Sequence, residues 1–183
     1  MLERQLIHMR QLESLAFLRS DGLWDLEVTF SDRKARTFPG AARDHPAGTP
    51  IHAMTLVCTV DERGAVVAAQ ARMDAVPFDV ACPQAAPQYA ALVGLNLFDQ
   101  FRARLRERLG GQAGCSHLSM LAETLPTLAI QAFAGITAPV RDDGSAAQAP
   151  PLLDRCMGLR RDGEAVRLYW PRWHRPGPAV GVR

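Results

Sequence analysis

The sequence predicts an α+β domain in which an antiparallel sheet of three or more strands comes first and helices packed on one face follow. Apolar residues recur with a period of two through much of residues 6–73, the spacing of strands with one buried face. After Pro77 the apolar period changes to about 3.6 residues, as in an amphipathic helix. Strands followed by helices are typical of α+β domains rather than of alternating βαβ folds.

Short extended runs open the chain, at residues 6–12, 15–19 and 23–30. Asp21-Gly22 is a turn dipeptide that predicts a hairpin between the last two runs. Residues 34–50 combine several prolines and glycines with little apolar content, which predicts a long surface loop.

The clearest strand covers residues 51–60, where strict alternation puts one set of side chains on a candidate core face: His52, Met54, Leu56, Cys58 and Val60. A turn over residues 61–64 leads into a second strand over residues 65–73, so a second hairpin is expected. Cys58 has apolar neighbours on the same face, which predicts that it packs as a small hydrophobic residue.

Three helices are expected next. Pro83 suits the first position of a helix that continues through residues 85–93. The second carries an apolar stripe that ends at a glycine pair: Leu97, Phe98, Phe101, Leu105 and Leu109. The third is expected from about Ser116 to Phe133, with a kink at Pro126.

The predicted organisation is one α+β domain over residues 1–138, a linker over 139–151, and a C-terminal extension over 152–183 that packs on the domain. The linker is rich in Ala, Pro, Gly, Asp and Ser. A short strand pair is expected around Asp162-Gly163 in the extension.

The composition sets limits on partners. The chain is 48% hydrophobic and 22% charged, as in ordinary globular domains. A net charge of +2 gives no general attraction to nucleic acid or to anionic membranes, so neither is expected as a partner. No run approaches the roughly 18 to 20 apolar residues that span a bilayer, and residues 1–10 lack a signal-peptide core. A cytoplasmic protein is expected, in which cysteines pack, bind metal or react rather than form disulfides.

Two cysteines and two histidines carry the chemistry that the sequence indicates: His52, Cys82, Cys115 and His117. Each cysteine stands at the start of an expected helix, where the helix dipole favours a thiolate. His117 follows Cys115 by two residues, and compact packing is expected to bring His52 and Cys82 to the same end of the sheet. This set suits zinc, iron or an iron–sulfur cluster, although the spacing is not that of a zinc finger.

The remaining histidines are expected to be structural. His8 alternates with apolar neighbours and is expected to be half-buried and hydrogen-bonded. His45 and His174 are expected to be solvated, and Cys156 to be structural or idle. The sequence has no glycine-rich phosphate loop and no nucleophile elbow, so nucleotide binding is excluded.

Four segments together resemble the bacterial family known as domain of unknown function 2889: Arg19-Ser-Asp-Gly-Leu-Trp-Asp25, Ile51-His-Ala-Met54, Cys82, and Gly110-Gly-Gln-Ala-Gly-Cys-Ser-His-Leu118. The resemblance covers about residues 6–173. The last of these segments is its most specific part, and the family name implies no activity.

Residues 52–123 also resemble, more weakly, the iron–sulfur cluster scaffold proteins of the NifU and IscU type, which place an antiparallel sheet before helices. His52-Ala-Met54 falls at that family's Asp-x-Met, and His117-Leu-Ser-Met-Leu-Ala122 resembles its His-Cys-Ser-x-Leu-Ala. Leu118 and Pro50 stand where the family has cysteines. The resemblance therefore implies a site at the same corner of the fold with a different ligand set.

The leading hypothesis is a metal or iron–sulfur carrier, scaffold or accessory subunit that works with a protein partner, with homo-oligomers left open. One alternative is a sulfur- or acyl-transfer enzyme with Cys82 or Cys115 as nucleophile and His117 as base. Another is a zinc hydrolase that uses an open coordination position, with Asp74 or Asp79 as the nearest candidate bases.

Overall fold

The computed structural model describes residues 2–137, 140, 142, 144 and 147–177. The chain divides into two compact units, Met1–Ala129 and Ile130–Arg183. The division falls inside helix α2 (Ser116–Phe133), earlier than the expected end of the domain at residue 138. Several positions of the expected linker, residues 139, 141, 143, 145 and 146, lie outside the described residues.

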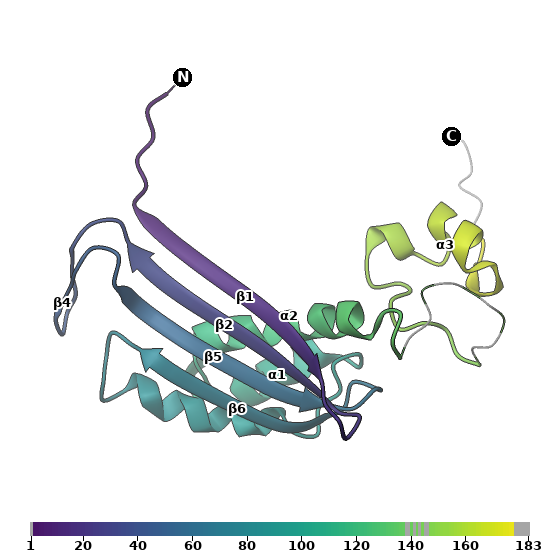
Figure 1. Ribbon diagram of the computed structural model, residues 1–183, viewed down its shortest axis with the longest axis horizontal. Coiled ribbons are helices and arrows are strands. Elements are labelled where there is room, and N and C mark those ends of the chain that lie inside the picture. The colour runs from purple at the N-terminus through teal and green to yellow at the C-terminus, as the bar shows by residue number, and fades with distance from the viewer. Residues whose placement is uncertain (1, 138–139, 141, 143, 145–146, 178–183) are drawn as a thin grey trace. The chain divides into compact units, whose positions relative to one another are not determined.

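Four antiparallel strands form the sheet of the N-terminal unit, in the order β1-β2-β5-β6 (Figure 1). Their bounds are His8–Leu18, Trp24–Lys34, Pro50–Val60 and Val66–Ala75. Helices follow the sheet in the chain, which confirms the predicted α+β class. The first two expected runs form one strand, because residues 8–18 pair with β2 without a break in register. Gly22 closes the predicted turn at a φ of 82°, where glycine is favoured.

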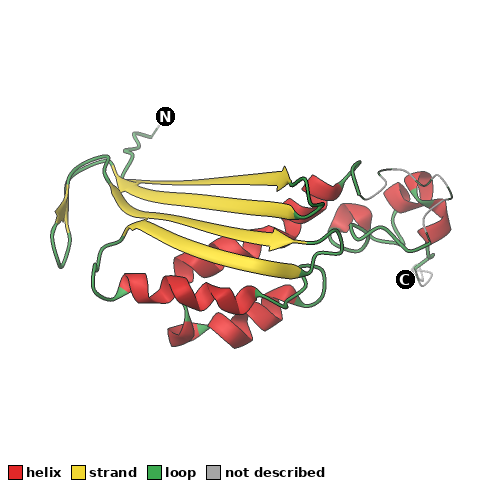
Figure 2. Cartoon of the chain, turned by 60° about the horizontal axis from the view of Figure 1, so that its bottom comes forward, coloured by secondary structure: helices red, strands yellow, loops and turns green. Residues whose placement is uncertain are grey.

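One face of the sheet is covered by helices (Figure 2). They are the 3₁₀ helix η1 (Cys82–Leu92), α1 (Phe101–Leu109), the short 3₁₀ turn η2 (Gly111–Ala113) and α2. The strands bury alternate residues toward them: Trp24, Leu26, Val28 and Phe30 from β2, and Met54, Leu56, Cys58 and Val60 from β5. The core face expected from residues 51–60 is thereby confirmed from Met54 onward, and His52 lies half-buried at its end.

The helices end near their expected positions, but α1 begins at Phe101, so Leu97 and Phe98 of the expected stripe precede it. The first is a 3₁₀ helix rather than an α-helix; Pro87 lies inside it and lacks the N–H that an α-helical bond requires there. Helix α1 stops at Gly110, where a Cβ atom would lie 2.3 Å from the Arg106 carbonyl oxygen. Helix α2 has the expected bounds and continues past Pro126 to Phe133.

The expected surface loop contains a small two-stranded ribbon, β3 (Phe38–Pro39) and β4 (Asp44–His45), which extends beyond the end of the sheet (Figure 1). His45 was expected to be solvated, and this is wrong, since the residue is only 5% exposed. Its ring stacks on Phe38 with centroids 6.1 Å apart, and it borders Gly40 so closely that a Cβ atom there would lie 3.0 Å from the imidazole. The ribbon therefore folds over the ring.

The described part of the C-terminal unit contains η3 (Met157–Leu159), α3 (Glu164–Tyr169) and η4 (Pro171–Trp173). The strand pair expected around Asp162-Gly163 is wrong, because Gly163 is the residue before α3. Inside this unit Leu152, Leu153 and Val166 form a small core. Among the described residues of the whole chain, no helix combines the length and the apolar character needed to cross a bilayer.

Cys58 provides a test of the core assignment. It is fully buried, and burial raises the pKa of its thiol to about 12, so it is a neutral packing group at physiological pH. We expect Cys58→Ala to lower the free energy of unfolding by about 1–2 kcal/mol, as a small core truncation. Urea denaturation measures this. The exposed Cys156 provides the control, since Cys156→Ala is expected to change stability by less than about 0.5 kcal/mol; equal effects of the two variants would contradict the assignment.

Candidate functional site

A buried carboxylate lies at the centre of the candidate site. The Asp32 side chain is only 4% exposed, near the end of β2 and on the face that the helices cover. Strand register places it directly between Arg10 of β1 and His52 of β5. Three neighbouring strands therefore present polar groups at one level of a face that is otherwise apolar.

Arg10 and His8 hold the Asp32 carboxylate from β1. Arg10 donates from Nε to Oδ1 at 2.8 Å and from an Nη to Oδ2 at 2.7 Å, a bidentate arrangement, and His8 Nε2 lies 2.9 Å from Oδ1. Burial by itself raises the pKa of Asp32, but the hydrogen bonds from Arg10 and His8 outweigh it, so the pKa is lowered. Asp32 is therefore ionised at neutral pH. His8 is hydrogen-bonded as predicted, but it is exposed rather than half-buried.

Two imidazole rings lie on the other side of the same carboxylate. His52 Nδ1 is 3.4 Å and His117 Nε2 is 3.9 Å from Asp32 Oδ2, and the two ring centroids are 4.1 Å apart. Phe30 stacks on His117 with centroids 5.3 Å apart and planes inclined by 14°. Burial lowers the pKa of both histidines, and for His52 the nearby His117 lowers it further. Both rings are therefore neutral at pH 7, with a lone pair free to bind a metal.

Asp32, His52 and His117 each offer one ligand atom, and these atoms lie within 4.8 Å of one another. His52 Nδ1 is buried and has no hydrogen-bond partner among the described residues. Leaving such an atom unpaired costs on the order of 1–3 kcal/mol, which a ligand on that nitrogen would recover. Two neutral imidazoles and a carboxylate are a donor set that suits zinc or iron(II) with open coordination positions.

All four residues that the sequence singled out line one pocket of about 480 Å³: His52, Cys82, Cys115 and His117. The two histidines also belong to the close group around Asp32. Within the described residues, that group contains neither cysteine. The four-residue ligand set thus stays a prediction, while the pocket that the four residues share is an observation.

The cysteines are positioned by the starts of two helices. Cys82 begins η1, and Cys115 directly precedes α2. The Tyr89 hydroxyl of η1 lies 2.7 Å from the Cys115 carbonyl oxygen, to which it donates, and 2.7 Å from Ser119 Oγ. It also accepts from the Cys115 N–H at 3.2 Å. Tyr89 therefore fixes the backbone of Cys115 against η1.

Sequence reasoning missed Asp32 and Arg10. A signal for Asp32 was present, because alternate residues of β2 point to the same face and Asp32 falls in the same set as the buried Val28 and Phe30. A carboxylate at a core-face position needs a partner, and so marks a candidate polar site. Nothing local in the sequence identifies Arg10 as that partner, since the pairing depends on the register between β1 and β2.

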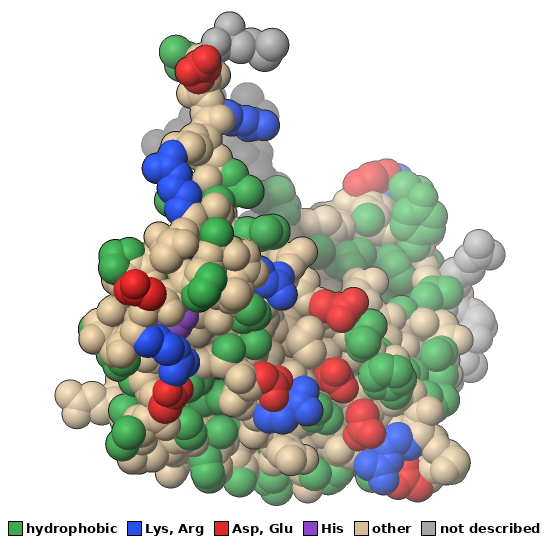
Figure 3. Space-filling view, turned by 60° about the vertical axis from the view of Figure 1, so that its left-hand side comes forward, with side chains coloured by type: hydrophobic (Ala, Val, Ile, Leu, Met, Phe, Trp, Pro, Cys, Tyr) green, Lys and Arg blue, Asp and Glu red, His purple; other side chains and the backbone are tan. Residues whose placement is uncertain are grey.

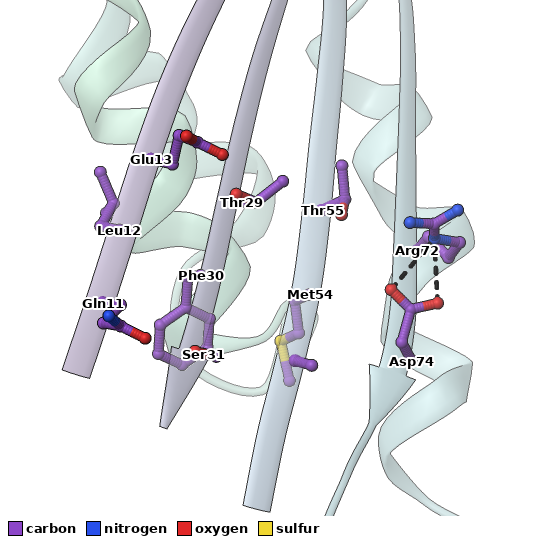
Figure 4. Close-up of a pocket in the computed structure, with 11 residues that line it drawn as sticks. Gln11, Leu12, Glu13, Thr29, Phe30, Ser31, Met54, Thr55, Arg72 and Asp74 are labelled. Atoms are coloured by element: carbon purple, nitrogen blue, oxygen red, sulfur yellow. Dashed lines mark hydrogen bonds and ion pairs between the residues drawn. The ribbon is translucent and has the colours of Figure 1, made fainter. Parts of the chain in front are cut away.

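A second hollow, of about 570 Å³, lies on the opposite face of the sheet (Figure 4). Its polar groups include Gln11, Glu13 and the exposed ion pair of Arg72 with Asp74. Asp74 was one of two candidate bases for a hydrolase, and the other, Asp79, pairs with Arg43. Neither aspartate is among the residues that line the pocket of His52, so this geometry does not favour them as bases for that site.

The charged side chains on the molecular face in Figure 3 are mixed in sign, with acidic groups interspersed among basic ones. This agrees with the net charge of +2. On this face, the described residues therefore present no broad positive surface of the kind that binds nucleic acid backbones.

A family model described as protein of unknown function (DUF2889) matches residues 8–131. The matched stretch contains the whole sheet and the candidate site. Comparisons with curated proteins and with solved structures give no match. They therefore give no support to the resemblance to NifU- and IscU-type scaffold proteins. Because the family model matches most of the chain, the chain belongs to the DUF2889 family of proteins of unknown function.

Proposed function

We propose that this protein binds a single divalent transition metal, zinc or iron, through Asp32, His52 and His117. In this proposal it acts as a metal carrier, scaffold or accessory subunit together with a protein partner. The observation that carries the proposal is that the three ligand atoms lie within 4.8 Å of one another, and that His52 Nδ1 is buried with no hydrogen-bond partner among the described residues.

The groups around Asp32 support a metal-binding role for its carboxylate. Ligating carboxylates are usually hydrogen-bonded themselves, which orients them toward the metal. Arg10 and His8 supply these bonds, and each carboxylate oxygen has two lone pairs, so Oδ2 can bind a metal while it accepts from Arg10. Arg10 also offsets the charge of Asp32, so the two neutral histidines contribute much of the binding.

The pocket next to this group supports a role for the cysteines. Cys82 and Cys115 line the same space as the two histidines, and thiolates are soft ligands that zinc and iron accept. A mononuclear ion fits this donor set better than an iron–sulfur cluster, because clusters are held mainly by several cysteine thiolates.

A second candidate is a cysteine-dependent sulfur- or acyl-transfer enzyme. What favours it is that Cys115 and His117 line one pocket with the apolar side chains of Met54, Pro77 and Phe78. Such a pocket suits a small acyl group beside a nucleophile and a base. A thioester or persulfide trapped on Cys115 in metal-free protein would favour this candidate over the metal carrier.

Metal binding is tested first by replacing one of the three proposed metal-binding residues. We expect the purified protein to bind zinc or iron(II), and His117→Ala to weaken that binding at least about 100-fold, because it removes one of three ligands. Competition with a chromogenic chelator and elemental analysis measure this. His174→Ala, in the C-terminal unit, is the matched control and should bind normally. Cys82→Ser and Cys115→Ser then test each sulfur. Unchanged metal affinity in a folded His117→Ala protein would contradict the proposed site.

The pH dependence follows from the two histidines. Their pKa values are lowered from 6.5 by burial, so the folded protein holds them neutral where the unfolded chain takes up protons. We therefore expect the metal-free protein to lose stability as the pH falls through about 6.5 toward 5. Urea denaturation at a series of pH values measures this. The double variant His52→Gln and His117→Gln should have a flatter profile, and an unchanged slope would show that these histidines are not the source.

A further inference from the structure

Strand β1 is an edge of the sheet, and the described residues leave one row of its backbone groups without a strand partner. The Ala35 N–H bonds the Ile7 carbonyl at 3.2 Å, and the Arg19 N–H bonds the Leu23 carbonyl at 2.8 Å, so odd-numbered residues of this strand face β2. In an antiparallel pair the hydrogen-bonding direction alternates. The N–H and C=O groups of the even-numbered residues therefore point outward: His8, Arg10, Leu12, Ser14, Ala16 and Leu18.

The side chains of β1 leave this edge open to pairing. The strand has 11 residues, contains no proline, and pairs with β2 without a bulge. Short length, prolines, bulges and charged side chains are the usual protection of an edge strand. β1 has none of the first three, and its charged side chains are Arg10, which pairs with Asp32, and Glu13. Several large apolar side chains on it are exposed instead: Met9, Leu12, Leu15, Phe17 and Leu18, at 39–53%. Figure 4 shows Gln11, Leu12 and Glu13 on this edge strand.

We propose that β1 pairs with β1 of a second copy of this chain, antiparallel about a two-fold axis at Leu12, to join two sheets into one. This inference is independent of the metal site. A two-fold axis perpendicular to the sheet keeps the corresponding faces of the two copies on the same side. In such an antiparallel pair, the residue at the axis lies opposite the same residue of the second copy. The sequence of β1 selects which residue that is.

With the axis at Leu12, apolar side chains meet apolar ones, since Met9 lies opposite Leu15 and Leu12 opposite Leu12. Gln11 then lies opposite Glu13, a pair that can form a hydrogen bond. An axis at Glu13 would instead put two carboxylates directly opposite each other, which is destabilising. An axis at Gln11 would put Glu13 opposite Met9, and Leu12 opposite Arg10. This self-complementarity favours a second copy over an unrelated strand as the partner.

The proposed pairing leaves the site of Asp32 intact. Leu12 is opposite Phe30 in the β1–β2 register, so the axis does not pass through the side chains that bind Asp32. Arg10 would contribute backbone groups to the second copy while its side chain stays on Asp32. Pairing would thus hold in place the strand that carries two of the partners of Asp32.

The test uses complementary charges on the full chain. Sedimentation velocity over a range of micromolar concentrations should detect a dimer. Leu12→Lys and Leu12→Glu should each weaken self-association roughly 10- to 100-fold, because like charges meet at the axis. An equimolar mixture of the two variants should associate again. Val67→Lys is the matched control, since Val67 is 45% exposed on the edge strand β6, and it should leave the dimer unchanged.

Amide hydrogen exchange on the unmodified protein gives a second readout that needs no variant. The outward amides of Arg10, Leu12 and Ser14 should exchange slowly in the dimer and faster on dilution. A monomer at all concentrations, or a dimer that both Leu12 variants retain, would overturn the proposal. So would a mixture of the variants that fails to associate, or a dimer in which these amides exchange rapidly.

Discussion

The N-terminal unit is organised around one buried negative charge. A carboxylate removed from water costs several kcal/mol unless positive or hydrogen-bonding groups surround it, so Asp32 constrains whatever lies next to it. On one side, β1 must lie in a register that brings Arg10 and His8 to the carboxylate. On the other side, β5 and the start of α2 must bring His52 and His117 close. Asp32 thus fixes β1, β2, β5 and the start of α2 relative to one another.

Much of the fold could be predicted because its signals are local. Alternation over residues 51–60 identifies the buried face of β5, and the sequence from Ser116 to Phe133 has the period of the helix that forms there. Local patterns were misleading where another contact decided the outcome. His45 has the polar neighbours of a surface residue, yet Phe38 and Gly40 enclose its ring.

The site was only half predictable for the same reason. His52 and His117 were recognised because one opens a strand and the other a helix at the same end of the domain. Asp32 left a local signal, but its partner Arg10 depends on strand register, which places residues 22 positions apart side by side and leaves no mark in the local sequence. The cysteines line the same pocket as the histidines, but the third member of the close group is a carboxylate, and a ligand role for either cysteine stays a prediction.

The positions of these groups along the chain also set the order in which synthesis supplies them. Arg10 and Asp32 lie on the two arms of one hairpin and are made early. His117 is made much later, with α2. A metal ion that needs all three ligands can therefore bind only after α2 has been made.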